Sequence, residues 1–152
     1  MVRFVVFLVL AALAWAGVLY FIDHAGPGLT VAQLILDAGP LQKLLILLLN
    51  LTTLVAIGFG VMGLFDRTGA ARGVLLALAF GAPALGALGA LYGAMVIWTA
   101  IQRVGGEVSS QVWAPGAAES LTPLALGLSG ATVAALFATF ARKRSAEAPA
   151  TA

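Results

Sequence analysis

Four long apolar runs, separated by short polar stretches, constrain this chain more than any other feature of its sequence. A membrane-spanning helix needs roughly 20 mostly apolar residues, and each run supplies that length: residues 4–22, 41–65, 74–101 and 117–141. Only 9% of all residues are charged, whereas soluble domains average about 25%. The sequence therefore predicts an all-α integral membrane protein with four transmembrane helices. They form a single domain, residues 1–145, followed by an Ala/Pro-rich, disordered tail, residues 146–152.

The first apolar run has two features of a cleavable signal peptide. Arg3 precedes it, and Ala14-Trp15-Ala16 offers a small-x-small cleavage site. The run continues to Ile22, however, whereas the apolar part of a signal peptide usually ends after about 7–15 residues. We expect this segment to be retained as a helix, with cleavage as the alternative.

Lysine and arginine residues indicate how the helices are oriented. If the N-terminus is cytoplasmic, six of the eight basic residues lie on the cytoplasmic side: Arg3, Arg67, Arg72, Arg142, Lys143 and Arg144. Lys43 and Arg103 then lie outside. The positive-inside rule favours this arrangement, so both termini are predicted to be cytoplasmic.

The outer connection between the first two spans, residues 23–40, contains a possible short helix. Thr30 is suited to cap it, and Val31, Leu34 and Ile35 would form its apolar face. Such a helix would lie on the outer leaflet, and an ordered loop is the alternative.

The third and fourth spans are rich in glycine and alanine. In the third, small residues recur every four positions and a GxxxG pair lies on a neighbouring face: Ala82, Gly86, Ala90 and Ala94, with Gly89 and Gly93. The fourth has two such stripes: Gly127, Ala131 and Ala135, and Gly130, Ala134 and Ala138. Small residues let helix backbones approach closely. We therefore predict an inner ring formed by these two helices in a homo-oligomer, with the bulkier first two helices outside.

A few residues within the spans interrupt the apolar pattern. Pro83 and Pro123 each remove one backbone donor, and a neighbouring helix or water can satisfy the freed carbonyl. They either kink the helices or simply shape their packing. Asn50, Thr52 and Thr53 are expected to form hydrogen bonds across helices, with an ion site as the alternative.

The composition argues against several functional classes. The chain has no cysteine and one histidine, His24, so no metal cluster, thiol chemistry or nucleophile–base pair is expected. We predict a protein that is not an enzyme and that needs no cofactor. No basic patch suited to nucleic acid is present, and the lipid bilayer is the expected environment.

Two segments in order, separated by a polar outer loop, resemble the paired channel helices of the MotA/TolQ/ExbB proton-channel family. The first segment contributes Ala82, Pro83, Leu85, Gly86, Leu88, Gly89 and Gly93. The second contributes Ala114, Pro115, Gly116, Glu119, Leu121, Ala125, Gly127 and Leu128. The resemblance covers residues 80–141 and agrees with the predicted helix directions.

This resemblance implies a subunit of a proton- or ion-motive-force-coupled complex in the bacterial inner membrane. It implies a homopentamer whose hydrophobic lumen holds transmembrane helices of a MotB/TolR/ExbD-like partner, which supplies a proton-carrying aspartate. The spans themselves contain no deep acidic residue, and such a charge would usually mark a transport path.

The chain departs from the family pattern at two pore positions and in one domain. Ala90 and Leu124 stand where family members usually carry threonine, and Thr122 lies about 200° around the helix from Leu124. The large cytoplasmic domain is reduced to the loop 66–73. A non-conducting structural subunit, or an unrelated four-helix transporter or hole-forming protein, are therefore the alternatives.

The resemblance and the small-residue stripes together give a set of channel- or partner-facing candidates. They are Pro83, Gly86, Gly89, Ala90, Gly93, Pro115, Gly116, Glu119, Thr122, Leu124 and Gly127. Glu119 is expected in the first turn of the fourth helix, where a carboxylate is favourable. It would contact the partner or Arg103, or act as a solvated or capping residue.

Overall fold

The computed structural model describes residues 1–26, 28–65, 69–105 and 108–147, with side chains placed up to residue 141. In this part of the chain the regular elements are five helices: α1 (Val2–Ala25), α2 (Val31–Asp37), α3 (Pro40–Gly63), α4 (Ala70–Val104) and α5 (Ser110–Glu147). Four of them, all but α2, are long and apolar enough to cross a membrane. The prediction of an all-helical, multi-pass membrane protein is confirmed to this extent.

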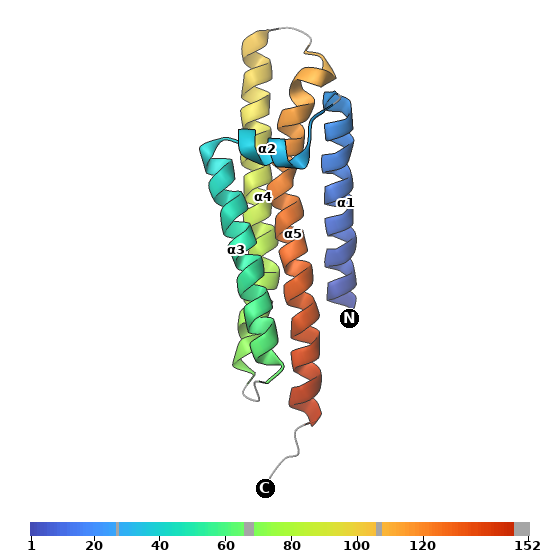
Figure 1. Cartoon of the computed structure of the whole chain (residues 1–152), viewed down its shortest axis with the longest axis vertical. Coiled ribbons are helices and arrows are strands. Elements are labelled where there is room, and N and C mark those ends of the chain that lie inside the picture. The colour runs from blue at the N-terminus through green and yellow to red at the C-terminus, as the bar shows by residue number, and fades with distance from the viewer. Residues whose placement is uncertain (27, 66–68, 106–107, 148–152) are drawn as a thin grey trace.

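Helix α5 is the centre of the bundle. It packs against α1, α3 and α4 (Figure 1), and the short α2 crosses it near one end. Between Trp113 and Thr139, no residue of α5 is fully exposed. The start of α1 and the end of α5 lie at the same end of the bundle.

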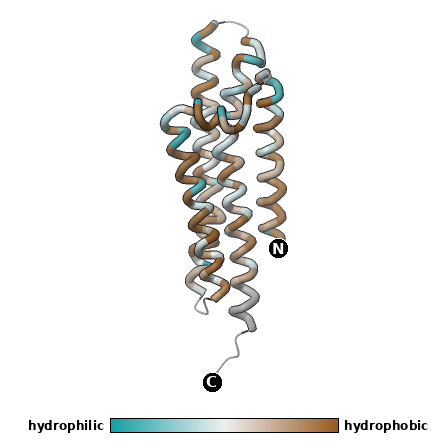
Figure 2. Tube along the Cα trace, in the orientation of Figure 1, coloured by the Kyte–Doolittle hydropathy of each residue, from teal (hydrophilic) through white to brown (hydrophobic). Residues whose placement is uncertain are grey.

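The outer helices carry the bulky apolar surface. Figure 2 shows that apolar residues predominate along α1 and α3, and large side chains such as Leu13, Leu47 and Leu54 are exposed there. Because these exposed side chains are apolar, this surface suits contact with lipid chains. The glycine- and alanine-rich sequence of α5 instead suits a position among three other helices.

Glycines allow the closest approach in the bundle, between the antiparallel helices α4 and α5. A Cβ atom at Gly86 would lie 2.5 Å from the carbonyl oxygen of Pro123, and one at Gly127 would lie 2.5 Å from that of Ala82. Each helix therefore presents a glycine to the backbone of the other. Any larger residue at either position would force the two helices apart.

Single contacts of other kinds fix α1 and α3 on α5. The indole nitrogen of Trp15 donates to Ser129 Oγ at 3.1 Å, and Val18 is completely buried beside Ala118 and Ala125. On the other side, the ring of Phe137 fills the space over Gly60 of α3. At each contact, an aromatic side chain of one helix lies against a small residue of the other.

The helix that was expected between the first two spans is present as α2. Thr30 and Gln33 form a capping box, in which Gln33 N donates to Thr30 Oγ1 at 3.2 Å and Thr30 N donates to Gln33 Oε1 at 2.9 Å. Leu34 is buried against α1 and α5. The alternative of an ordered loop is excluded.

Several helices extend beyond the predicted spans, because hydropathy marks the apolar part of a helix and not its whole length. The fourth long helix begins at Ser110, seven residues before the predicted span, so Pro115 lies inside α5. Helix α4 begins at Ala70 and α1 continues to Ala25. Residues 146 and 147 of the predicted tail belong to α5, and residues 148–152 lie outside the described residues, as do 66–68 of the inner loop.

At about 1.5 Å per residue, the 35 residues of α4 and the 38 of α5 form helices of over 50 Å. The hydrocarbon core of a bilayer is about 30 Å thick. Both helices are therefore longer than is needed to cross that core, and they extend beyond their apolar runs. Polar residues such as Gln102 and Gln111 lie in these extensions, outside the apolar runs on which the span predictions were based.

Substitution of either glycine at the α4–α5 contact should destabilise the protein. Gly86→Ala and Gly127→Ala each place a methyl group against a backbone carbonyl, and we expect a loss of about 1–3 kcal/mol in the free energy of unfolding. The loss can be measured by tryptophan fluorescence during unfolding in mixed micelles. Gly58→Ala and Gly81→Ala are matched controls in α3 and α4, because a Cβ atom there meets no other atom within 4 Å. Equal losses in all four variants would contradict this account of the contact.

Candidate functional site

The eleven candidate residues predicted from the sequence all lie on α4 and α5, and most take part in packing these helices together. Five are buried inside the single chain: Gly86, Gly89, Gly93, Thr122 and Gly127. Six are half-buried: Pro83, Ala90, Pro115, Gly116, Glu119 and Leu124. None is fully exposed. The structure thus brings the two segments together, and it does so within one chain.

The glycines of α4 show why these positions are small. Gly86 faces Pro123 and Leu124, Gly89 faces Pro123 and Leu45, and Gly93 faces Ser120. The stripe that we assigned to neighbouring subunits is therefore occupied by α5 and α3 of the same chain. Small-residue spacing identified a close helix contact correctly, but it carries no information about which chain supplies the second helix.

Pro123 leaves one backbone carbonyl of α5 without its usual donor, and a side chain of α3 replaces that donor. Because proline has no backbone N–H, it cannot bond to the carbonyl four residues earlier in the helix, which is that of Glu119. Gln42 Nε2 donates to this carbonyl at 2.8 Å, and Gln42 is buried. The side chain of α3 thus supplies the hydrogen bond that α5 lacks. The sequence carries a signal for this bond, because Gln42 lies at the start of one apolar span and Pro123 interrupts another.

The carboxylate of Glu119 has a role in the same contact. Gly39 N donates to Glu119 Oε1 at 3.1 Å, and Gly39 is the N-cap residue of α3. A carboxylate at the start of a helix pairs with free backbone N–H groups and with the positive end of the helix dipole. Glu119 therefore caps α3 through its side chain, while its carbonyl accepts from Gln42.

The predicted surroundings of Glu119 were wrong in two respects. It lies nine residues beyond Ser110, the first residue of α5, and it caps α3 and not its own helix. Arg103 is not its neighbour. The cleft beside Glu119 is bounded on α4 by Tyr92 and Val96, and Arg103 lies seven residues further along, about 10 Å at the rise of an α-helix.

The cleft beside Glu119 has a volume of about 280 Å³ and lies where α3, α4 and α5 meet. Pro40, Tyr92, Ile97 and Gly116 line it together with the Glu119 side chain. Its walls are otherwise mostly apolar. Glu119 is the carboxylate that lines this cleft, and it lies close to the start of α3.

The hydroxyl groups of the spans are used within their own helices. Thr122 Oγ1 donates to the Ala118 carbonyl at 2.9 Å, and Thr132 Oγ1 donates to that of Leu128 at 2.8 Å. Each of these residues is buried. Neither hydroxyl extends toward Ala90 or Leu124 to replace the threonines of the family pattern.

The expected hydrogen bonds across helices from α3 are replaced by local ones. Asn50 Nδ2 donates to the Ile46 carbonyl at 2.8 Å, and Thr52 and Thr53 both donate to the carbonyl of Leu49. A serine, threonine or asparagine in a helix can always reach a carbonyl three or four residues earlier. Because this local bond requires no partner helix, it forms in place of a bond across helices. Thr53 still packs against Gly130 of α5.

Comparison of the chain with protein-family models, with curated proteins and with solved structures gave no match. The resemblance to the MotA/TolQ/ExbB family therefore rests on the residues of the two segments alone.

The bond between Gln42 and the Glu119 carbonyl leads to a double-mutant prediction. Gln42→Leu leaves a partly buried carbonyl without a donor, which should lower the free energy of unfolding by about 1–3 kcal/mol. Pro123→Ala restores the backbone donor within α5. In the Pro123→Ala background, Gln42→Leu should therefore cost measurably less, with a coupling of about 1 kcal/mol. Unfolding in mixed micelles gives the four free energies, and strictly additive effects would refute the proposed replacement.

Proposed function

We propose that this chain is a subunit of a homo-oligomeric membrane complex of the MotA/TolQ/ExbB kind, in a bacterial inner membrane. Both termini are cytoplasmic in this proposal. The chain does not catalyse a reaction; it surrounds the transmembrane helices of a partner and couples an ion-motive force to their movement. A homopentamer is the stoichiometry that the resemblance implies.

One observation carries this proposal: the two segments on which the resemblance rests pack against each other as an antiparallel pair. Gly86, Gly89 and Gly93 of the first segment face Ser120, Pro123 and Leu124 within the second. Their contact supports treating α4 and α5 as one functional unit.

The open face of α4 is the surface that we assign to assembly. Opposite the glycines, Leu88, Leu91 and Met95 are exposed, and no described helix covers them. In the proposed ring, this face of α4 lines the lumen or meets the next subunit. Helices α1 and α3 then face the lipid, as their exposed leucines and valines suit.

The partner would supply the ion-carrying group. The described carboxylates are those of Asp23, Asp37 and Glu119. Asp23 and Asp37 lie at the ends of α1 and α2, and Glu119 lies beside the start of α3. A single-span MotB/TolR/ExbD-like protein with an intramembrane aspartate would complete the path.

A non-conducting structural subunit is the second candidate, and it has its own supporting observation. Ala90 and Leu124 are hydrocarbon side chains at the positions where a hydroxyl is expected, and the Thr122 hydroxyl is bonded to the Ala118 carbonyl. Such a subunit would keep the ring and the partner but would not pass ions.

The oligomer can be tested by cysteine cross-linking, because the chain has no native cysteine. Leu91→Cys on the open face of α4 should form disulfide-linked dimers on mild oxidation in membranes. Leu13→Cys, an equally accessible position on α1, should not. Native mass spectrometry should show five copies, and a stable monomer would refute the proposal. Gly89→Leu is unsuitable as a test, because it disrupts packing inside the chain.

Ion conduction needs a separate measurement. In vesicles that hold this chain and a neighbouring-gene protein with one aspartate-bearing helix, we expect partner-dependent proton flux. Ala90→Thr combined with Leu124→Thr should increase that flux if these positions border the path. A pentamer with no flux in either form would favour the structural candidate.

A further inference from the structure

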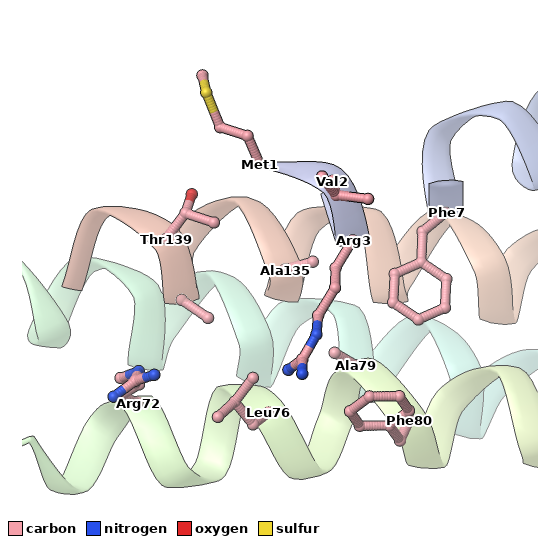
Figure 3. Close-up of a pocket in the computed structure, with 11 residues that line it drawn as sticks. Met1, Val2, Arg3, Phe7, Arg72, Leu76, Ala79, Phe80, Ala135 and Thr139 are labelled. Carbon is pink, nitrogen blue, oxygen red and sulfur yellow. The ribbon is translucent and has the colours of Figure 1, made fainter. Parts of the chain in front are cut away.

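A second cavity lies at the opposite end of the bundle from Glu119, where α1 and α4 begin (Figure 3). Its volume is about 320 Å³, and it is formed between α1, α4 and α5. None of the eleven candidate residues lines it. The proposed ring therefore assigns no role to this cavity.

Two arginines from different helices reach this cavity. Arg3 extends from α1 toward α4, and Arg72 lies on α4 on the far side of Leu76 (Figure 3). The Arg3 guanidinium carbon is 5.9 Å from the centre of the Phe80 ring. Neither arginine forms an ion pair with a described carboxylate, since Asp23, Asp37 and Glu119 lie toward the other end. Two cationic groups thus face one space without a described counter-charge.

Apart from Thr139, the rest of the side-chain lining is apolar. Leu76 and Ala79 of α4 and Ala135 of α5 form walls. Toward the middle of the bundle, Phe7 and Phe80 form an edge-to-face pair with ring centres 6.2 Å apart. This pair closes the cavity on that side and joins α1 to α4. The space therefore combines a cationic rim with an apolar wall.

We propose that this cavity binds the phosphate group of an anionic phospholipid. Arginine is suited to phosphate because its planar guanidinium donates two parallel hydrogen bonds. Basic pockets between transmembrane helices are suited to anionic head groups, particularly on the cytoplasmic side. Phe80 and Val2 are exposed apolar side chains at the edge of the cavity, where an acyl chain would lie. The bound lipid would bridge α1 and α4, both of which otherwise pack mainly on α5.

Native mass spectrometry of the purified full chain, titrated with phosphatidylglycerol or with phosphatidylcholine, tests this proposal. We expect phosphatidylglycerol to bind about 30-fold more tightly, from the combined attraction of two basic side chains. Arg3→Gln combined with Arg72→Gln should remove this preference. Lys43→Gln combined with Arg103→Gln makes the same charge change at the other end and should preserve it.

Three results would overturn the proposal. They are no preference in the unaltered protein, an equal loss in both double variants, or displacement of phosphatidylglycerol by millimolar inorganic phosphate. The last would assign the site to a soluble phosphate compound. If the glutamine variant fails to fold, Arg3→Lys with Arg72→Lys keeps the charge but loses the paired hydrogen bonds. That variant should bind phosphatidylglycerol more weakly and phosphatidylcholine unchanged, and unchanged binding of both lipids would refute the proposal.

Discussion

The reciprocal contact between the glycines and backbone carbonyls of α4 and α5 is the constraint on which the rest of the bundle depends. Gly86 lies against the Pro123 carbonyl, and Gly127 lies against the Ala82 carbonyl. In a membrane, helices gain little from hiding apolar surface, because lipid is equally apolar. Close packing and polar contacts must therefore hold them together. These glycines permit backbones to meet where larger side chains would separate them, so dispersion contacts accumulate along α4 and α5.

The same contact requires α3 to be where it is. Pro123 fills space beside Gly89, but it leaves the Glu119 carbonyl without its donor in the helix. In a medium without water, an unpaired backbone group is costly. Gln42 provides the donor, and the Glu119 side chain in turn caps α3 at Gly39. Glu119 of α5 thus accepts two hydrogen bonds from α3, one at its backbone carbonyl and one at its side chain. These bonds fix the position of α3 along the axis of the bundle.

The sequence was sufficient to predict the four spans and the short helix. It was insufficient to predict the contacts between helices. Apolar runs located all four long helices, and Thr30 marked the start of α2 because a helix cap is a local interaction. Helix ends outside the lipid were missed, since Ser110 and Gln111 are polar but still helical. The partner of Glu119 was also missed. Gly39 is 80 residues away in the chain, and the sequence contains no measure of that separation in space.

The intramolecular use of the small residues changes what an assembly of this chain would require. Had the glycine stripes been open, subunits could have joined by close backbone contact, which is specific even in lipid. Those positions are already filled by α3 and α5. What remains open on α4 is one face with small residues toward its start, Ala77, Gly81 and Ala84, and larger side chains further along, Leu88, Leu91 and Met95. The larger side chains gain little over lipid unless a partner matches their shape, whereas the small ones allow close backbone contact. A ring built on this face would therefore draw its stability from complementary packing along its whole length.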